Sequence, residues 1–138
     1  MTQEDKSLLL QDLCARLPYG VKIHHGIPTL LISIKSDRDG MKIITEGSYG
    51  EHIFDIEDMK PCLRPMSSIT EEEKKEAHRL FTVLYDRNDV ICGIQINSFV
   101  QLGTVTEWLN AHHFDYRGLI EKGLALKALE GMYNLKDE

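Results

Sequence analysis

The residues of this chain best suited to chemistry lie close together near its C-terminus: His112, His113, Asp115 and Arg117. A histidine binds metal ions or acts as a general base, and a neighbouring carboxylate orients it for either task. Adjacent residues of a helix point about 100° apart, so His112 and His113 are poorly placed to share one ion. The spacing favours structural roles, with Asp115 capping a helix and Arg117 paired with a carboxylate. His112 is then partly buried, and His113 hydrogen-bonds free carbonyl groups at a helix end.

No metal site is predicted from the remaining candidate ligands. Cys14, Cys62 and Cys92 lie far apart and form no Cys-x-x-Cys pair, so neither a zinc site nor a redox motif is expected. The stretch 37–46 overlaps the pattern of a calcium-binding loop, but Lys35 occupies the position of the first ligand. A hairpin turn explains the same residues. We therefore expect no metal and no cofactor.

Length and composition indicate one ordinary domain over residues 1–138. The chain is 42% hydrophobic and 28% charged, as in many globular proteins, and it is long enough to bury a core. It contains no run of eighteen apolar residues and no basic start followed by an apolar stretch, so neither a membrane span nor a signal peptide is expected. Together with widely spaced cysteines, which we take to be reduced, these features predict a cytoplasmic protein.

The charge balance argues against nucleic acid as a partner. The net charge is −6, and no segment is strongly basic. Helices over 104–113 and 115–122 would resemble a helix-turn-helix in outline, but the second would offer only Arg117 and Lys122 to a DNA groove. Packing of the two helices against the domain is the better interpretation.

The first half of the chain predicts a helix followed by an antiparallel sheet. A helix is expected over 4–17, with one apolar stripe formed by Leu10, Leu13, Cys14 and Leu17. Strands over 29–35 and 41–46 form a hairpin around an Asp-Gly turn, with Leu30, Ile32 and Ile34 on one face. A weaker strand is expected over 52–56, and two prolines make 60–65 an extended connection.

The second half predicts three further helices. Thr70 and Glu73 form a capping box for a helix that runs to about Tyr85 and precedes a strand over 90–96. A second capping box at Thr104 opens a short helix over 104–113 that contains Trp108. A last helix runs from Asp115 to Lys122, before Gly123 and a short strand or ordered tail over 124–129. The fold class is thus α+β: an N-terminal helix, an antiparallel sheet, a central helix and a C-terminal pair of short helices. The expected core contains Ile32, Ile34, Leu80, Phe81, Leu84, Trp108 and Leu109.

Two segments resemble blocks of a known group of proteins. The stretch 108–126, WLNAHHFDYRGLIEKGLAL, resembles the ending of small uncharacterised proteins from gut Bacteroides genomes and their phages or prophages. Residues 60–73, KPCLRPMSSITEEE, resemble a second block of the same group, and the two blocks cover about a quarter of the chain. The resemblance implies a phage or mobile-element setting. It implies no activity, and no catalytic residue is carried over from it.

Two classes of function therefore stay open. The first is a binding or regulatory protein that docks on another protein, which small size, acidic charge and the lack of a catalytic motif favour. Its expected site is the outer face of 104–123, where His113, Tyr116 and Arg117 would be accessible; tyrosine and arginine are enriched at binding hot spots. The second is a small enzyme in which the histidines, Asp115 and Arg117 line one cleft.

Overall fold

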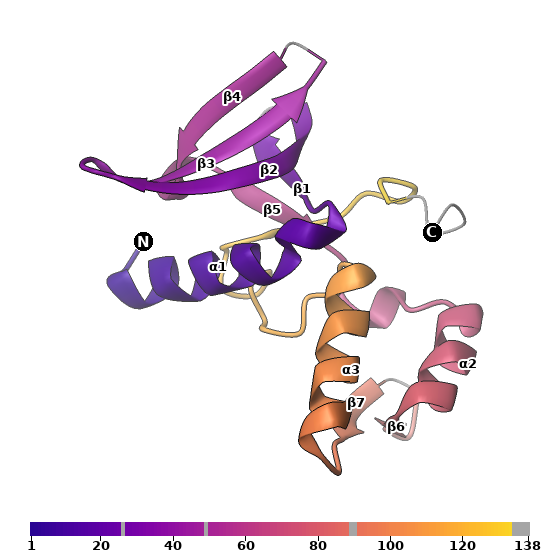
Figure 1. Cartoon of the computed structure of the whole chain (residues 1–138). Helices are drawn as coiled ribbons and strands as arrows, with labels where there is room; N and C mark the ends of the chain where they lie inside the picture. The colour runs from indigo at the N-terminus through magenta and orange to yellow at the C-terminus, as the bar shows by residue number, and fades with distance from the viewer. Residues whose placement is uncertain (26, 49, 89–90, 134–138) are drawn as a thin grey trace.

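The computed structural model describes residues 1–25, 27–48, 50–88 and 91–133 (Figure 1). Over these ranges it has three α-helices, a curled six-stranded sheet and a separate two-stranded sheet, which confirms the predicted α+β class. None of the helices in these ranges is long and apolar enough to cross a membrane.

The N-terminal helix α1 spans Gln3–Arg16 and begins at a capping box of Thr2 and Asp5. It lies across one face of the larger sheet (Figure 1). Its buried face differs from the predicted stripe, because Cys14 is exposed while Asp12 and Arg16 are fully buried beside Leu9 and Leu13. Hydrophobic periodicity does not identify a face that includes a buried ion pair.

The larger sheet has the strand order β4-β3-β2-β1-β5-β8. Its strands are β1 (Lys22–His25), β2 (Ile27–Asp37), β3 (Gly40–Gly47), β4 (Gly50–Asp55), β5 (Lys60–Leu63) and β8 (Leu126–Lys127). All neighbours are antiparallel except β5 and β8. The predicted hairpin is therefore confirmed as β2–β3. The expected connection at 60–65 contains a strand, β5, which lies between β1 and β8.

The predicted buried face of β2 is right at Ile34, which packs against the core, but wrong at Leu30 and Ile32. Leu31 is buried, whereas Leu30 and Ile32 are 41% and 36% exposed. A β-bulge between Leu31 and Ser33 shifts the pairing with β3 by one residue. Side chains alternate between the faces of a strand, so an extra residue changes which ones point to the core, and simple alternation cannot locate it.

Two hydrophobic clusters make up the core of the described residues. The first lies between α1 and the larger sheet and contains Leu9, Leu13, Val21, Ile23, Leu31, Ile43, Ile56, Met59, Leu63, Leu119, Leu124 and Ala125. The second lies among α2 (Glu71–Leu80), β6 (Thr82–Tyr85), β7 (Ile91–Gln95) and α3 (Phe99–Ala111), and contains Ala77, Phe81, Val83, Val105, Trp108, Leu109 and Phe114. Short 3-10 turns occur at Leu17–Tyr19, Ile56–Asp58 and Met66–Ser68.

The central helix is shorter than predicted. The capping box of Thr70 and Glu73 is present, but α2 ends at Leu80 and the chain continues as β6, which pairs with β7. The β-type sequence Thr-Val-Leu-Tyr of β6 alternates in burial, so Val83 is buried while Leu84 is 47% exposed. Leu80 is 44% exposed and also lies outside the core. The strand expected over 90–96 is confirmed over Ile91–Gln95, and Val90 lies outside the described residues.

The predicted pair of C-terminal helices is wrong. A single helix, α3, begins at the cap residue Ser98, and Thr104 lies inside it with its hydroxyl donating to the carbonyl of Val100. Residues 115–122 contain no helix, with a turn over 119–123, and Gly118 and Gly123 have left-handed φ angles of 72° and 74°. Without a second helix, the described residues do not form the helix-turn-helix outline. Trp108 and Leu109 are buried as expected.

Candidate binding site

The segment after α3 joins the two hydrophobic clusters through its backbone. The amide of Arg64, just after β5, donates to the carbonyl of His113 at 2.8 Å, and the amide of Asp115 donates to the carbonyl of Arg64 at 2.8 Å. Phe114 lies between these bonds as the bridge partner of Arg64 and is fully buried. The residues near the C-terminus that are suited to chemistry are thus held where the two hydrophobic clusters meet.

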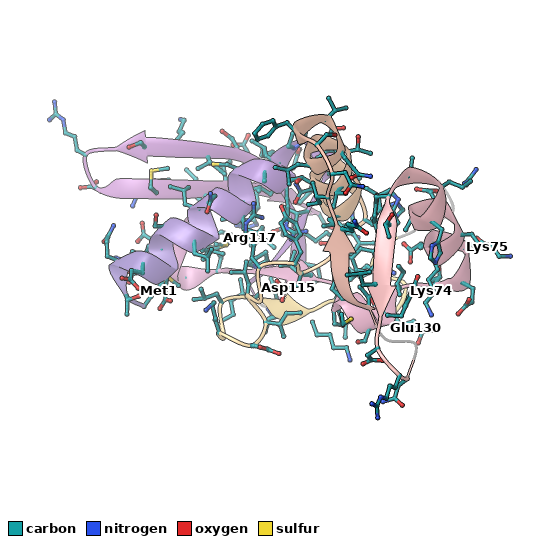
Figure 2. All side chains as sticks on the ribbon, turned by 90° about the horizontal axis from the view of Figure 1, so that it is seen from below. Met1, Lys74, Lys75, Asp115, Arg117 and Glu130 are labelled. Atoms are coloured by element: carbon teal, nitrogen blue, oxygen red, sulfur yellow. The ribbon has the colours of Figure 1, made fainter. Side chains whose placement is uncertain are left out.

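Arg117 is paired with a carboxylate, as the sequence predicts. Its Nη1 lies 2.7 Å from Oδ1 of Asp12, whose other oxygen accepts from Nε of Arg16 at 2.8 Å. Arg16 also donates to the carbonyl of Phe114 at 2.6 Å, and both guanidinium groups contact the ring of Tyr116. Figure 2 shows Arg117 beside α1. This network ties α1 to the C-terminal segment, which gives Arg117 a structural role.

His113 is buried, so the expectation that it is accessible is wrong. Only 2% of the residue is exposed, and its ring stacks on that of Tyr133 with centroids 3.7 Å apart. Burial and the positive charges of Arg16 and Arg64 lower the pKa of His113 to about 3. The side chain is therefore a neutral imidazole, and the hydroxyl of Tyr133 fixes the stack by donating to the carbonyl of Cys62 at 2.6 Å.

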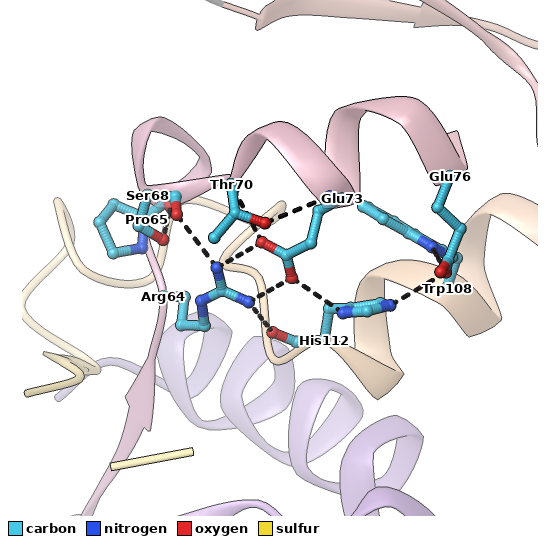
Figure 3. Close-up of polar contacts among 8 residues, drawn as sticks. All are labelled: Arg64, Pro65, Ser68, Thr70, Glu73, Glu76, Trp108 and His112. Carbon is cyan, nitrogen blue, oxygen red and sulfur yellow. Dashed lines mark hydrogen bonds and ion pairs between the residues drawn. The ribbon is translucent and has the colours of Figure 1, made fainter. Parts of the chain in front are cut away.

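His112 belongs to a second polar network, which holds α2 against α3 (Figure 3). Its Nδ1 lies 3.0 Å from Oε2 of Glu73, and its Nε2 lies 3.4 Å from Oε1 of Glu76. Arg64 binds both oxygens of Glu73 at 2.7 Å, and the indole of Trp108 donates to Glu76 at 2.5 Å. Burial alone would raise the pKa of Glu73, but the hydrogen bonds from Arg64 and His112 outweigh it and hold that pKa well below its usual range.

These contacts leave the four candidate catalytic residues apart. The carboxylate of Asp115 accepts from the amides of Leu119 and Ile120 at 2.9 and 3.0 Å, so it caps a turn. Of the cavities lined by described residues, the one that includes Asp115 includes neither histidine nor Arg117. The described residues also contain no cluster of three potential metal ligands. Among the described residues, none of the three cavities found here is lined by more than one of these four residues.

A groove of about 620 Å³ lies on the outer side of the C-terminal segment. One wall is the turn that carries Tyr116, Ile120 and Glu121, and the other wall is β7. The apolar lining between the walls includes Met66 and Leu109. Of the three residues predicted to bind a partner, Tyr116 lines this groove, whereas His113 and Arg117 do not.

The wall formed by β7 is a strand edge. Ile91, Cys92, Gly93 and Ile94 all line the groove, although consecutive strand residues point to opposite faces of a sheet. The bulge at Cys92 breaks this alternation and Gly93 has no side chain, and from the four consecutive lining residues we infer that the groove runs along the edge of the strand. Among the described residues β7 pairs with β6 alone, so its other edge has no strand partner there.

The segment that contains this edge is uncharged. Residues 91–106 contain no aspartate, glutamate, lysine, arginine or histidine, although 28% of the whole chain is charged. On the same segment Phe99 and Val100 are 93% and 82% exposed, and Ile96 and Leu102 are each 43% exposed. Exposed apolar residues grouped in this way are typical of surfaces that bind other proteins.

Sequence reasoning misses the groove because it assigns β6 to the preceding helix. Without β6 there is no two-stranded sheet, and the edge of β7 is not recognised. The uncharged run over 91–106 is the signal that points to this surface. A comparison with protein-family models, curated proteins and solved structures finds no match, so the site is argued from its own geometry.

Proposed function

We propose that this chain is a small binding protein that docks another protein in the groove beside β7. The observation that carries the proposal is that β7 lines an apolar groove and has one edge without a strand partner among the described residues. Tyr116 contributes an aromatic wall of the kind enriched at binding hot spots. The exposed apolar residues at the start of α3 extend the contact surface beyond the groove.

The chemistry of the groove supports binding over catalysis. Its ionisable side chains, apart from Tyr116, are Cys92, Asp115 and Glu121. Asp115 is occupied by two backbone amides, and Glu121 is exposed to solvent. General acid–base catalysis needs a positioned proton donor or acceptor with a partner that orients it. The groove offers no such pair among the described residues.

The proposed setting of this binding is a phage or another mobile element. It is supported by the resemblance of residues 60–73 and 108–126 to proteins of Bacteroides genomes and their phages. The second of these segments includes the wall of the groove from Asp115 to Glu121. A partner from the same setting is therefore part of the proposal.

A site-directed crosslinking experiment tests the docking site. Cys92 lines the groove, and Cys14 is exposed on α1, away from it. Two variants are made, each lacking one of these cysteines, and the remaining exposed thiol of each is labelled with benzophenone. We expect the Cys92 label to crosslink a protein in Bacteroides extract that the Cys14 label does not crosslink. An excess of the unlabelled chain should abolish this crosslink. That protein, once purified, should bind the parent chain saturably. Identical products from both labels, or no competition, would contradict the proposal.

A further inference from the structure

We infer that the groove takes an extended peptide segment of the partner, which adds to β6–β7 as a third strand. This inference rests on the proposed function and specifies the partner. The segment has apolar side chains at alternate positions and a basic residue at the end nearest Glu121. Backbone pairing supplies affinity in this mode of recognition, and pockets for alternate side chains supply specificity.

The hydrogen-bonding groups of β7 call for another strand. One edge of β7 is paired with β6 through Val83 and Leu84, opposite Ile94 and Gly93. The opposite edge has no strand partner among the described residues, and only a second backbone presents donors and acceptors at the spacing that such an edge offers. Cys92 is an extra residue at a bulge, so Gly93–Gln95 forms the regular part of this edge.

The edge of β7 lacks the features that protect strand edges from pairing. Exposed strand edges in proteins commonly carry proline, or lysine and other charged residues. In the larger sheet, the edge strand β4 has Glu51 and Asp55, both exposed. The sequence Ile-Cys-Gly-Ile-Gln of β7 has neither a charge nor a proline. β4 and β7 therefore differ in the way expected if β7 binds a strand, and β6, whose sequence Thr-Val-Leu-Tyr is also uncharged, does not line the groove.

The lining of the groove sets the chemistry of the segment. Met66, Leu109 and Ile120 provide apolar contacts for side chains that point to one face of the added strand. The charged groups that line the groove are both carboxylates, Asp115 and Glu121. Asp115 is occupied by backbone amides, so the exposed Glu121 is the carboxylate left for a cation. An acidic segment is disfavoured there, and a segment with a terminal lysine or arginine is favoured.

A peptide library tests the inference even though the partner is unidentified. A displayed library of random heptapeptides is selected against the full chain and depleted against a Cys92→Arg variant, in which a long cationic side chain occupies the groove. We expect enriched peptides to have apolar residues at alternate positions and a basic residue at one end. Failure to enrich any peptide, or enrichment of acidic or non-alternating peptides, would overturn the inference.

The enriched peptide is then located by alkylation of the two exposed thiols. At a peptide concentration about ten times Kd, alkylation of Cys92 should slow about tenfold, because about a tenth of the chains remain free. Cys14 should react at its original rate and serves as the internal control. Anisotropy titrations should show weaker binding to Cys92→Arg than to Cys14→Arg, and to Glu121→Lys than to Glu130→Lys, since Cys14 and Glu130 do not line the groove.

Backbone methylation separates strand addition from docking in general. Methylating one peptide amide that faces β7 removes a hydrogen bond and adds bulk, so we expect affinity to fall about tenfold. Methylating the next amide, which faces away, should have little effect. If Cys92 is protected but methylation at neither position matters, strand addition is wrong and docking in the groove survives. If the peptide leaves Cys92 unprotected, both proposals fail. A dimer that protects Cys92 without any peptide would identify the occupant as a second copy of this chain and overturn the inference.

Discussion

Arg64 shows how one side chain supports several parts of the molecule. Its guanidinium binds both oxygens of Glu73, donates to the carbonyls of Ser68 and His112, and lies 4.3 Å from the centroid of the Phe114 ring. It thereby links the end of β5 to α2 and to the end of α3. Both partners of the ion pair are buried, so neither charge is stabilised by water once the other is removed.

We therefore predict that Glu73→Gln lowers the free energy of unfolding by about 3–5 kcal/mol, the usual cost of breaking a buried ion pair. The control is Glu72→Gln on the same turn of α2, where the side chain is exposed and the cost should stay within about 0.5 kcal/mol. Urea unfolding at neutral pH measures both variants. Equal stability of the two would mean that Arg64 and Glu73 are not paired in solution.

The burial of His113 predicts how stability depends on pH. Its pKa falls from an ordinary value near 6.5 to about 3 in the folded protein, because of burial and the charges of Arg16 and Arg64. The unfolded chain therefore binds a proton that the folded chain does not. The stabilising effect is fully present above pH 6.5 and is lost as the pH falls toward 3. Between pH 6.5 and 5 we expect this residue to contribute a slope of up to about 1.4 kcal/mol per pH unit.

His113→Asn tests this dependence, since asparagine tolerates the left-handed φ of 63° at this position. The variant should lose stability at every pH because the stack on Tyr133 is lost. Its stability should nevertheless change less than that of the parent between about pH 6.5 and 5. The lowered pKa of Glu73 adds a further loss in both proteins, but only below its ordinary value of 4.5. Parallel stability curves for parent and variant over this pH range would refute the buried neutral histidine.

At the scale of elements, two glycines and two possible caps decide the C-terminal structure. Helix capping chemistry is readable in the sequence at Thr70, where the hydroxyl and Glu73 act as predicted. The same pattern at Thr104 and Glu107 is misleading, because it lies inside α3 and Ser98 caps the helix instead. A capping motif marks the start of a helix only where the residues before it are not themselves helical.

Single substitutions at the two caps should therefore differ. Ser98→Ala removes the acceptor for the amide of Gln101 and should cost about 1 kcal/mol. Thr104→Ala removes only a hydroxyl that bonds within the helix, so it should be neutral or slightly stabilising. Thermal unfolding of the two variants and the parent measures the difference. A larger loss at Thr104 would place the start of the helix where the sequence pattern first suggests it.

Gly118 distinguishes a turn from a helix in the same way. In a helix, Gly118→Ala would stabilise the protein by roughly 1 kcal/mol, because alanine has the higher helix propensity. With a φ of 72° the substitution should instead destabilise it by about 1 kcal/mol, because a β-carbon disfavours this conformation. The sign of the change in urea unfolding is the readout, and stabilisation would restore the predicted second helix.

These elements also show how far sequence reasoning reaches. The β2–β3 hairpin, α1 and the start of α2 follow from local signals, which are the alternation around an Asp-Gly turn, an apolar stripe and a capping box. The end of α2 and the bulge after Leu31 depend on how the following strands pair, and the burial of the Asp12–Arg16 pair depends on Phe114 and Arg117, far along the chain. Tyr116 can be proposed as a binding residue from its type alone. The groove that it lines cannot be predicted without knowing that β6 pairs with β7.

At the scale of the whole molecule, the two hydrophobic clusters are coupled through a small set of polar contacts. Asp12 on α1 binds Arg16 and Arg117, and Arg16 reaches the carbonyl of Phe114 in the second cluster. Asp12 and Arg16 are fully buried. Replacing Asp12 leaves two guanidinium groups without their carboxylate, at a point where the first cluster meets the segment that follows α3.

We predict that Asp12→Asn both destabilises the protein and weakens the coupling between its two clusters. Trp108 is the only tryptophan and lies in the second cluster, so its fluorescence reports that cluster, while far-ultraviolet circular dichroism reports the whole chain. In the parent the two signals should change together on urea unfolding, as in a cooperative domain. In the variant we expect the midpoints to separate, because the carboxylate that joins α1 to the C-terminal segment is gone. Midpoints that stay together after a loss of several kcal/mol would show that the bridge between Arg64 and Phe114 couples the clusters without Asp12.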